Sequence, residues 1–343
     1  MIESSGDVPY DSLLVVSFGG PEGPDDVLPF LENVLRGRNV PRERMLEVAE
    51  HYQAFGGKSP INDQNRALIA ALTEELTVHG PDLPIYWGNR NWHPLLADTI
   101  GRMRDDGRKK SLAFFTSAYS SYSGCRQYRE NILDARSTVG VDSPEIHKLR
   151  AFYNHPGFIE PMVERVSGAL AEVPASAGDR CKVFYTAHSI PASMSEGCDY
   201  VLQLREACRL VSEELGLSDY ELVYQSRSGP PTQPWLEPDI CDAIQTACTS
   251  GEVKYVVIVP IGFVSDHMEV LFDLDTEARE LCEKLDVGLV RAGTVGTHPR
   301  FISMIRELVL ERTSGAERLT LGTLGPRADF CPEDCCPAPI RRR

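Results

Sequence analysis

The feature that most constrains the fold is an apolar run at residues 256–261, rich in β-branched side chains, that passes directly into an acidic helix. A nearly continuous apolar strand is typical of a parallel sheet that is covered on both faces. Gly262 ends the strand, and Ser265 or Asp266 is placed to cap a helix whose apolar residues recur at helical spacing. The sequence therefore predicts an α/β fold.

Three carboxylates follow one another four residues apart on this helix: Glu269, Asp273 and Glu277. An α-helix keeps such residues on nearly one side, and a π-bulged turn would align them more closely. Asp266 and Glu269 also fit a simpler interpretation, a capping residue and its partner three residues on. Position favours a functional role, because the carboxylates begin beyond the carboxyl end of a strand, where open α/β sheets bind ligands.

A repeated order of strand, polar loop and helix predicts the rest of the fold. We expect a first set of strands at residues 13–18, 85–88 and 111–116, and a second set at 145–149, 182–187, 221–225, 256–261 and 287–292. Because 343 residues are more than one core usually holds, we expect two similar Rossmann-like domains, each with a doubly wound parallel sheet. They would span residues 10–120 and 121–295, with a helix at 296–314 packing back on the first domain and a Cys/Pro-rich tail at 315–343.

Charge and hydropathy exclude several classes of protein. A net charge of −15 and a pI near 5.0 argue against nucleic-acid binding, which needs a concentrated basic surface. The first residues contain no apolar signal region, and no stretch approaches the ~18 consecutive apolar residues of a membrane span. We therefore expect a soluble, cytoplasmic monomer without a transmembrane segment.

His188 closes a predicted strand, so its imidazole is expected at the carboxyl edge of the sheet that also carries Glu269. A single histidine is more often structural than catalytic. A histidine and a glutamate that each follow neighbouring strands of one sheet are less often brought together by chance, which favours a functional role. Together their nitrogen and oxygen donors suit a divalent first-row metal ion.

Two further stretches carry polar groups whose use the sequence leaves open. The loop at residues 117–128 is rich in serine and tyrosine hydroxyls, which with Arg36 or Arg90 would suit ligand carboxylates, although serine-rich loops are often only turns. Most of the ten cysteines occur singly, as in a reduced protein. The proline-rich tail is different, because little apolar sequence is available there to bury its cysteines, and a metal or cluster explains them better than packing.

Several motifs resemble those of the ferrochelatase family over most of residues 11–310. They are LLVVSFGGPEGPDDVLPFLENVLRGR, HYQAFGGKSPIN, YWGNRNWHP, FYTAHSIP, YQSRSGPPTQPWLEP and PIGFVSDHMEVLFDLDTEA. Their number and order make the resemblance far more specific than a single signature. The residues within these motifs are similar to those of the actinobacterial branch. That resemblance implies that the substrates are Fe²⁺ and coproporphyrin III, bound in a cleft between the domains. The product would be Fe-coproporphyrin III, a precursor of heme b.

The resemblance also implies roles for individual residues. The metal-binding pair falls on His188 and Glu269, and Asp273 and Glu277 continue from it as an iron path. Porphyrin contacts, four of them to propionates and one a pocket wall, fall on Arg36, Tyr52, Ser59, Tyr128 and Trp235. The firmicute branch has a tyrosine that can ligate the product iron where this chain has Phe18, so a proximal ligand must come from elsewhere or from water.

Some members of the family, actinobacterial ones among them, carry a [2Fe-2S] cluster, which takes four ligands. The tail supplies three thiols: Cys331, Cys335 and Cys336. The fourth is expected from the folded body. Cys198 is the first choice, because it follows the His188 strand in a loop and lies on no apolar helix face, and Cys125 is the second. A zinc site and an unstructured tail remain alternatives.

The expected reaction explains these residue types. Insertion must strip water from Fe²⁺, remove two pyrrole protons and bend the macrocycle, a strain of about 1 to 5 kcal/mol drawn from remote binding. His188 and Glu269 are each suited to take a proton or to hold the metal, and the sequence does not divide the roles.

Three alternatives stand beside this interpretation: a protoporphyrin IX ferrochelatase, a non-catalytic tetrapyrrole carrier on the same fold, and a cobalt chelatase. A carrier would need the pocket but not the three carboxylates. The cobalt chelatases centre on histidine pairs, whereas this chain presents one histidine at the matching strand end. Beyond the porphyrin, the expected partners are neighbouring heme-pathway enzymes in transient contact.

Overall fold

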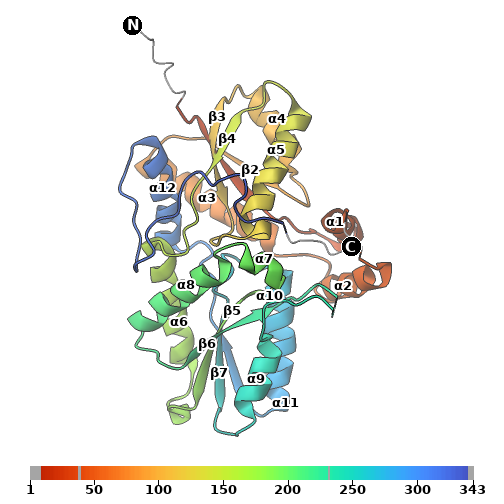
Figure 1. Ribbon diagram of the computed structural model, residues 1–343, viewed down its shortest axis with the longest axis vertical. Helices are drawn as coiled ribbons and strands as arrows, with labels where there is room; N and C mark the ends of the chain where they lie inside the picture. Colours follow the sequence, from red (N-terminus) through yellow and green to blue (C-terminus); the bar gives the residue numbers. More distant parts are fainter. Residues whose placement is uncertain (1–8, 38–39, 231, 339–343) are drawn as a thin grey trace.

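The computed structural model describes residues 9–37, 40–230 and 232–338, which form two four-stranded β-sheets with helices on both faces (Figure 1). The strands lie in the order β2-β1-β3-β4 in the first sheet and β6-β5-β7-β8 in the second. Neighbouring strands pair in parallel in both sheets. The predicted α/β fold with two doubly wound parallel sheets is confirmed.

The first sheet and its helices comprise β1 (Ser12–Ser17), α1 (Val27–Leu35), α2 (Arg42–Ala54), α3 (Ile61–His79), β2 (Ile85–Asn89), α4 (Leu96–Asp105), β3 (Lys110–Phe115), α5 (Gln127–Val139) and β4 (Glu145–Lys148). The second comprises α6 (Pro156–Glu172), β5 (Cys181–His188), α7 (Ala192–Glu196), α8 (Tyr200–Glu214), β6 (Tyr220–Gln225), α9 (Ile240–Cys248), β7 (Tyr255–Val259), α10 (Met268–Phe272), α11 (Ala278–Lys284) and β8 (Gly288–Arg291). Helix α12 (Pro299–Thr313) follows them. None of the helices in the described ranges combines the length and the apolar character that a membrane span requires.

The apolar run that ends in β7 is buried on both faces of its sheet. Val256 and Ile258 pack with α9 and α11, whereas Val257 and Val259 point into the core shared with α6 and α8. Successive side chains of a strand face opposite ways, so a strand between two helical layers must be apolar at every position. β1 shows the same alternation between two cores.

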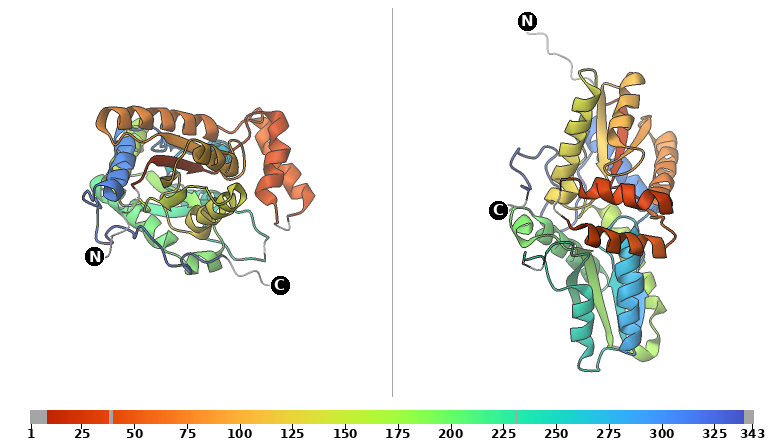
Figure 2. Two further views of the ribbon diagram at one scale, coloured as in Figure 1. Left: turned by 90° about the horizontal axis from the view of Figure 1, so that it is seen from above. Right: turned by 90° about the vertical axis from the view of Figure 1, so that its right-hand side faces the viewer.

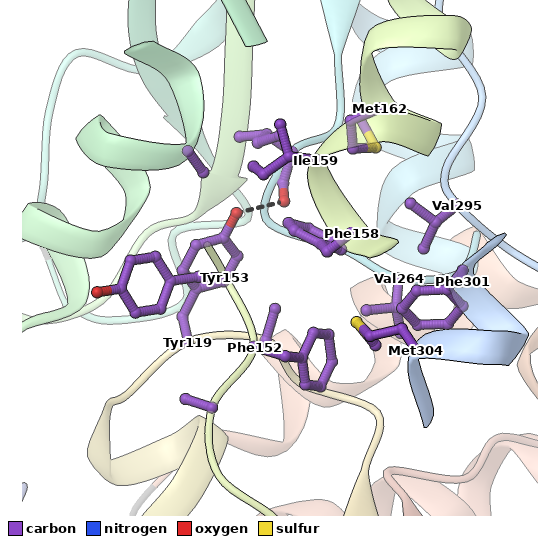
Figure 3. Packing of buried hydrophobic residues seen from close by; sticks show 14 of the residues in the cluster. Tyr119, Phe152, Tyr153, Phe158, Ile159, Met162, Val264, Val295, Phe301 and Met304 are labelled. Atoms are coloured by element: carbon purple, nitrogen blue, oxygen red, sulfur yellow. Dashed lines mark hydrogen bonds between the residues drawn. The ribbon is translucent and has the colours of Figure 1, made fainter. Parts of the chain in front are cut away.

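One hydrophobic cluster extends from the first sheet to the second (Figure 3). The rings of Phe152, Phe158 and Phe301 pack against one another with centroids 5.8 to 6.4 Å apart. Within the same cluster, the Tyr119 hydroxyl donates a hydrogen bond of 2.9 Å to the backbone carbonyl of Ile261. The loops at the carboxyl ends of β3 and β7 therefore meet, and the two sheets direct their functional edges toward each other.

Helix α12 packs against α3 of the first half and α6 of the second. Arg306 donates from Nε to the carbonyl oxygen of Gly80 at 2.7 Å. Glu311, with its side chain 1% exposed, receives two hydrogen bonds of 2.8 Å from the fully buried guanidinium of Arg150. The paired charges of this contact join α12 to the segment that follows β4.

The strand near residues 145–149 lies in the first sheet, so its predicted place at the start of the second set is wrong. β4 pairs with β3, with Glu145 opposite Lys110, and α5 packs on α4. A short apolar pattern predicts that a strand exists, but the choice of sheet depends on long-range pairing. A boundary between residues 120 and 121 would cut β4 from its hydrogen-bonded partner, and we propose a boundary after β4 instead.

The buried ion pair gives a prediction for stability. Replacing Glu311 by Ala leaves the Arg150 cation buried without its carboxylate, which should lower the free energy of unfolding by about 3–5 kcal/mol. Glu47→Ala is the matched control, because Glu47 pairs with Arg44 at the surface, both side chains being more than half exposed, and should cost less than about 1 kcal/mol. Urea unfolding measures both, and equal losses would show that the buried pair has no special role.

Candidate functional site

His188 is the last residue of β5 and lies at the carboxyl edge of the second sheet. Its Nδ1 is 2.5 Å from the backbone carbonyl oxygen of Ser189. A carbonyl oxygen only accepts, so Nδ1 is the donor in this contact, and Nε2 is the nitrogen that can gain or lose a proton. That nitrogen faces Glu269, 3.5 Å from Oε2. The structure therefore brings together the two residues that the sequence analysis paired.

Gly262 lets the ends of β5 and β7 approach each other. Its N–H donates to the carbonyl of Thr186 at 3.0 Å, and a Cβ on Gly262 would lie 2.6 Å from that of Ala187. A larger residue would push the loop away from β5. The same strand end is held from α8, where the Tyr200 hydroxyl donates to the carbonyl of His188 at 3.0 Å.

The three carboxylates stand on a helix that changes its winding partway. α10 passes into a π-helical turn, η4 (Asp273–Glu277), and continues as α11. Within this turn the Thr276 hydroxyl donates to the carbonyl of Leu271, five residues earlier, at 3.4 Å. The wider turn brings residues four apart closer to one line, which agrees with the spacing found in the sequence.

The helix is capped by a residue that the sequence analysis did not select. His267 Nδ1 accepts a hydrogen bond of 3.3 Å from the N–H of Val270. The prediction of Ser265 or Asp266 as the cap is wrong, because Asp266 is drawn to Arg291 at 3.2 Å, a charged partner that outcompetes a backbone N–H. The interpretation of Asp266 as one half of a capping box is excluded as well.

Asp273, in the middle of the row of carboxylates, is strongly perturbed. Burial raises its pKa to about 7, with the charges of Glu269 and Glu277 acting in the same direction and hydrogen bonds from neighbouring side chains opposing them. The pKa of Glu277 is also raised, first by burial and then by the charge of Asp239. The row therefore lacks positive charge, which a proton or a divalent cation can supply.

Tyr52 belongs to a small aromatic cluster formed by α1 and α2, and packs edge-to-face on Phe30 with ring centroids 5.8 Å apart. Its pKa is raised by burial and by the charge of Glu269. The adjacent His51 stacks on Phe272 of α10, with centroids 3.8 Å apart. The pair α1 and α2 lies at one side of the molecule, at the height where the two halves meet (Figure 2), and α2 contacts the acidic helix through this stack.

Three more of the expected porphyrin residues belong to the first half, and two of them, Phe18 and Tyr128, share a contact with Arg90. The guanidinium of Arg90 is 5.7 Å from the ring centre of Phe18 and 4.5 Å from that of Tyr128. Tyr128 is only 5% exposed, and its ring is part of the core. Arg36 is exposed at the end of α1, where Nη2 donates to Asn33 Oδ1 at 2.5 Å. Of these, Arg36 is the cation that a ligand can reach without displacing packed side chains.

Ser59 and Trp235 differ in their surroundings. Ser59 is 2% exposed, and its Oγ accepts a hydrogen bond of 3.5 Å from the N–H of Ile61. A Cβ on Gly20 would lie 2.7 Å from that of Ser59, so the serine sits beneath the loop after β1. The backbone of Trp235 bridges to Pro191 in the loop that follows the His188 strand, and its indole lies against Gly229, where a Cβ would be 2.2 Å from Nε1.

The hydroxyl-rich loop after β3 uses some of its hydroxyls within the protein. Tyr119 donates to the loop after β7, Tyr122 donates to Glu130 Oε2 at 3.0 Å, and Ser120 is 5% exposed. For the other hydroxyls of the loop, binding of ligand carboxylates stays a prediction. The partner of Tyr119 comes from a distant part of the chain, which the loop sequence does not reveal.

The tail brings its cysteines against the body. Cys331 is hydrogen-bonded to Cys125, whose sulfur also accepts a hydrogen bond of 3.2 Å from Lys148 Nζ. The hydrogen bond from Cys125 and the nearby Lys148 cation lower the pKa of Cys331. Cys125, the second choice in the sequence analysis, therefore contacts a tail thiol directly.

The two remaining tail thiols lie nearer to α7. Cys335 and Cys336 are 3.4 Å apart at sulfur, and both interact electrostatically with Cys198. All ten cysteines are free thiols. Within the described ranges, no three His, Cys, Asp or Glu side chains are grouped closely enough to hold a metal ion. Because Cys331 also interacts with Cys335, the thiols of Cys125, Cys331, Cys335 and Cys336 follow one another in a series of contacts rather than around one closed site.

Known proteins resemble this chain over both sheets and the residues between them. The family model named Ferrochelatase matches residues 10–313. A ferrochelatase from Rhodopirellula baltica is 61% identical over 329 residues, which are 96% of this chain and 93% of that protein. A coproporphyrin III ferrochelatase from Streptomyces coelicolor is 53% identical, over 96% of this chain and 94% of that protein.

Solved structures share the fold at low sequence identity. SirB from Bacillus subtilis with Fe³⁺ matches with a TM-score of 0.56 and 13% identity, over 89% of this chain and 96% of that chain. The sirohydrochlorin chelatase SirB from the subspecies spizizenii, in complex with cobalt, gives 0.52 and 12% over the same shares. The family match and the high identity to curated relatives both extend over the strands that carry His188 and Glu269. The chain therefore belongs to the ferrochelatase family, whose members are lyases that insert a metal ion into a porphyrin.

Proposed function

We propose that this enzyme inserts Fe²⁺ into coproporphyrin III and so produces Fe-coproporphyrin III on a route to heme b. Relatives that are 47–53% identical, from Streptomyces and Nocardia among others, are named coproporphyrin III ferrochelatase. The 61% identical relative from Rhodopirellula baltica is named only ferrochelatase, so protoporphyrin IX is the alternative substrate. The exposed cation of Arg36 supports a substrate with carboxylates at its rim.

The observation that carries the chemistry is the His188 Nε2 that faces Glu269 across 3.5 Å. Because Nδ1 donates to the carbonyl of Ser189, Nε2 is the nitrogen that, in the neutral form of the ring, can accept a pyrrole proton or bind the incoming iron. The carboxylate of Glu269 can take the other task from the opposite side. The side chains are 33% and 48% exposed, so a substrate can reach both.

The row of carboxylates serves in this proposal as the route by which iron arrives. Glu277 is exposed at the outer end, Asp273 is largely buried in the middle, and Glu269 stands beside His188. Carboxylate oxygens are ligands for a hydrated divalent cation, and each step exchanges one of its waters for protein oxygen. A non-catalytic porphyrin carrier would have no use for this row.

The first prediction concerns His188→Ala. Metal insertion should fall by about 100-fold or more, the usual contribution of a positioned acid or base, while the porphyrin still binds, because the residue serves the metal step. Anaerobic turnover with Fe²⁺ and quenching of porphyrin fluorescence measure the two properties. His79→Ala, at an exposed end of α3, is the control. Wild-type turnover in His188→Ala would show that the site is misassigned.

The second prediction concerns the substrate. The specificity constant for coproporphyrin III should exceed that for protoporphyrin IX by about tenfold or more, because one added charge-assisted hydrogen bond contributes about 1.5–3 kcal/mol. Arg36→Met should reduce this ratio, whereas the surface variant Arg104→Met should leave it unchanged. A preference for protoporphyrin IX in the wild type would contradict the proposed substrate.

We also propose that the tail cysteines hold a [2Fe-2S] cluster. The residue types support this proposal, because thiols of the tail lie near Cys125 in the turn before α5 and near Cys198 in the loop after α7, although in the structure no three of these side chains are close enough to share a metal ion. Lys148 is partly buried beside Cys125, and among the described residues no carboxylate pairs with it. A nearby cation favours thiolates, the form that binds iron. When bound, the cluster would supply an iron–sulfur redox centre.

The fourth ligand can be tested directly. Cys125 is favoured as the fourth ligand because it contacts Cys331, whereas the sequence analysis favoured Cys198 because of its position in a loop. Anaerobically purified protein should contain about two iron and two acid-labile sulfide per chain, and visible absorption should be lost in Cys125→Ser and kept in Cys248→Ser. Loss in Cys198→Ser instead would restore the first choice of the sequence analysis. Stoichiometric zinc without sulfide would rule out the cluster and leave the chelatase intact.

A further inference from the structure

The structure leaves one buried polar atom unpaired beside the row of carboxylates. Gln225 is the last residue of β6, stands opposite His188 in the β5–β6 ladder, and is 0% exposed. Its Oε1 has no hydrogen-bond partner among the residues that the structure describes. A buried acceptor without a donor costs about 1–3 kcal/mol, so an unpaired atom at this position points to a donor that is supplied from outside the chain.

The other end of the same amide is occupied, which fixes its orientation. Nε2 donates to Asp273 Oδ2 at 3.1 Å and to the backbone carbonyl of Glu269 at 3.4 Å. A backbone carbonyl only accepts, so the nitrogen must face it. If the amide were rotated by 180°, Oε1 would face the carbonyl of Glu269, and Nε2 would lose both of its acceptors. Oε1 is therefore held in place, and the vacant position belongs to a donor.

Ser226 shows that the position of Asp273 is maintained at a cost. Its φ is 60°, in the left-handed region that residues other than glycine rarely adopt. This backbone places the Ser226 hydroxyl where it donates to Asp273 Oδ2, the oxygen that Gln225 also contacts. Because both donors converge on Oδ2, Oδ1 is the oxygen that they leave for a cation.

We propose that Gln225 is a positioning residue for the incoming metal ion: Nε2 holds Asp273, and Oε1 accepts a hydrogen bond from a water molecule on hydrated Fe²⁺. Glu269 and Asp273 meet a cation as carboxylates, whose oxygens only accept, so in that state neither of them can donate to Oε1. Water on a divalent cation is a strong donor. Gln225 would thus orient the hydration shell while Asp273 Oδ1 replaces one of its waters.

This inference rests on the proposed iron path through Asp273, and its test separates the two ideas. Gln225→Met keeps the size of the side chain but removes both hydrogen-bonding ends. The KM for Fe²⁺ should rise by about tenfold or more, the loss of one hydrogen bond to a charged partner. The KM for porphyrin and the Kd from fluorescence quenching should change less than twofold, because Gln225 serves the metal only.

Gln203→Met is the matched control. Gln203 is equally buried at 1% exposed, but both ends of its amide are bonded to Ser120, away from the carboxylates. Its substitution should lower Tm without a selective change in the KM for Fe²⁺. If Gln225→Met also lowers Tm and shifts both KM values equally, its role is structural and the proposal is overturned.

Asp273→Asn completes the set. If Asp273→Asn raises the KM for Fe²⁺ and Gln225→Met does not, the iron path stands and the role of Gln225 is overturned, with Oε1 satisfied by a resident water instead. If neither variant changes it, the iron path fails and the inference fails with it. Selective increases in both variants support the inference.

Discussion

The hydrogen bond from the Gly262 N–H to the carbonyl of Thr186 joins the ends of two neighbouring parallel strands, and the functional site depends on it. His188 ends one of these strands, and the helix that carries Glu269 leaves the other. Parallel strands necessarily end at one edge of their sheet, but only a close approach of the following backbone brings the two side chains within 3.5 Å. A residue without Cβ is what allows that approach.

The fold holds the three carboxylates close together although their mutual repulsion is unfavourable. Like charges and burial both disfavour ionised Asp273, and Ser226 adopts an unfavourable backbone angle to support it. Costs of this kind are retained at sites where a ligand compensates for them. The same reasoning explains why the hydrogen-bond donors near Asp273 come from the end of β6, next to His188, rather than from solvent.

The sequence predicted whatever depends on local pattern or on strand order. It located most strands to within a few residues, the four-residue spacing that suits the π turn, and the pairing of His188 with Glu269. It failed where a long-range partner decides the outcome. β4 joins the first sheet because it pairs with β3, and His267 caps α10 because Arg291 pairs with Asp266. The hydroxyl of Tyr119 donates to the distant backbone of Ile261. None of these partners is visible in a local window.

The stack of His51 on Phe272 links a helix of the first half to the helix that bears the carboxylates. Helices α1 and α2 share an aromatic cluster of their own, so the stack ties this cluster, and not one helix alone, to the helix that bears the carboxylates. A substitution that disturbs the packing of α1 on α2 would therefore weaken a support of that helix without touching any carboxylate.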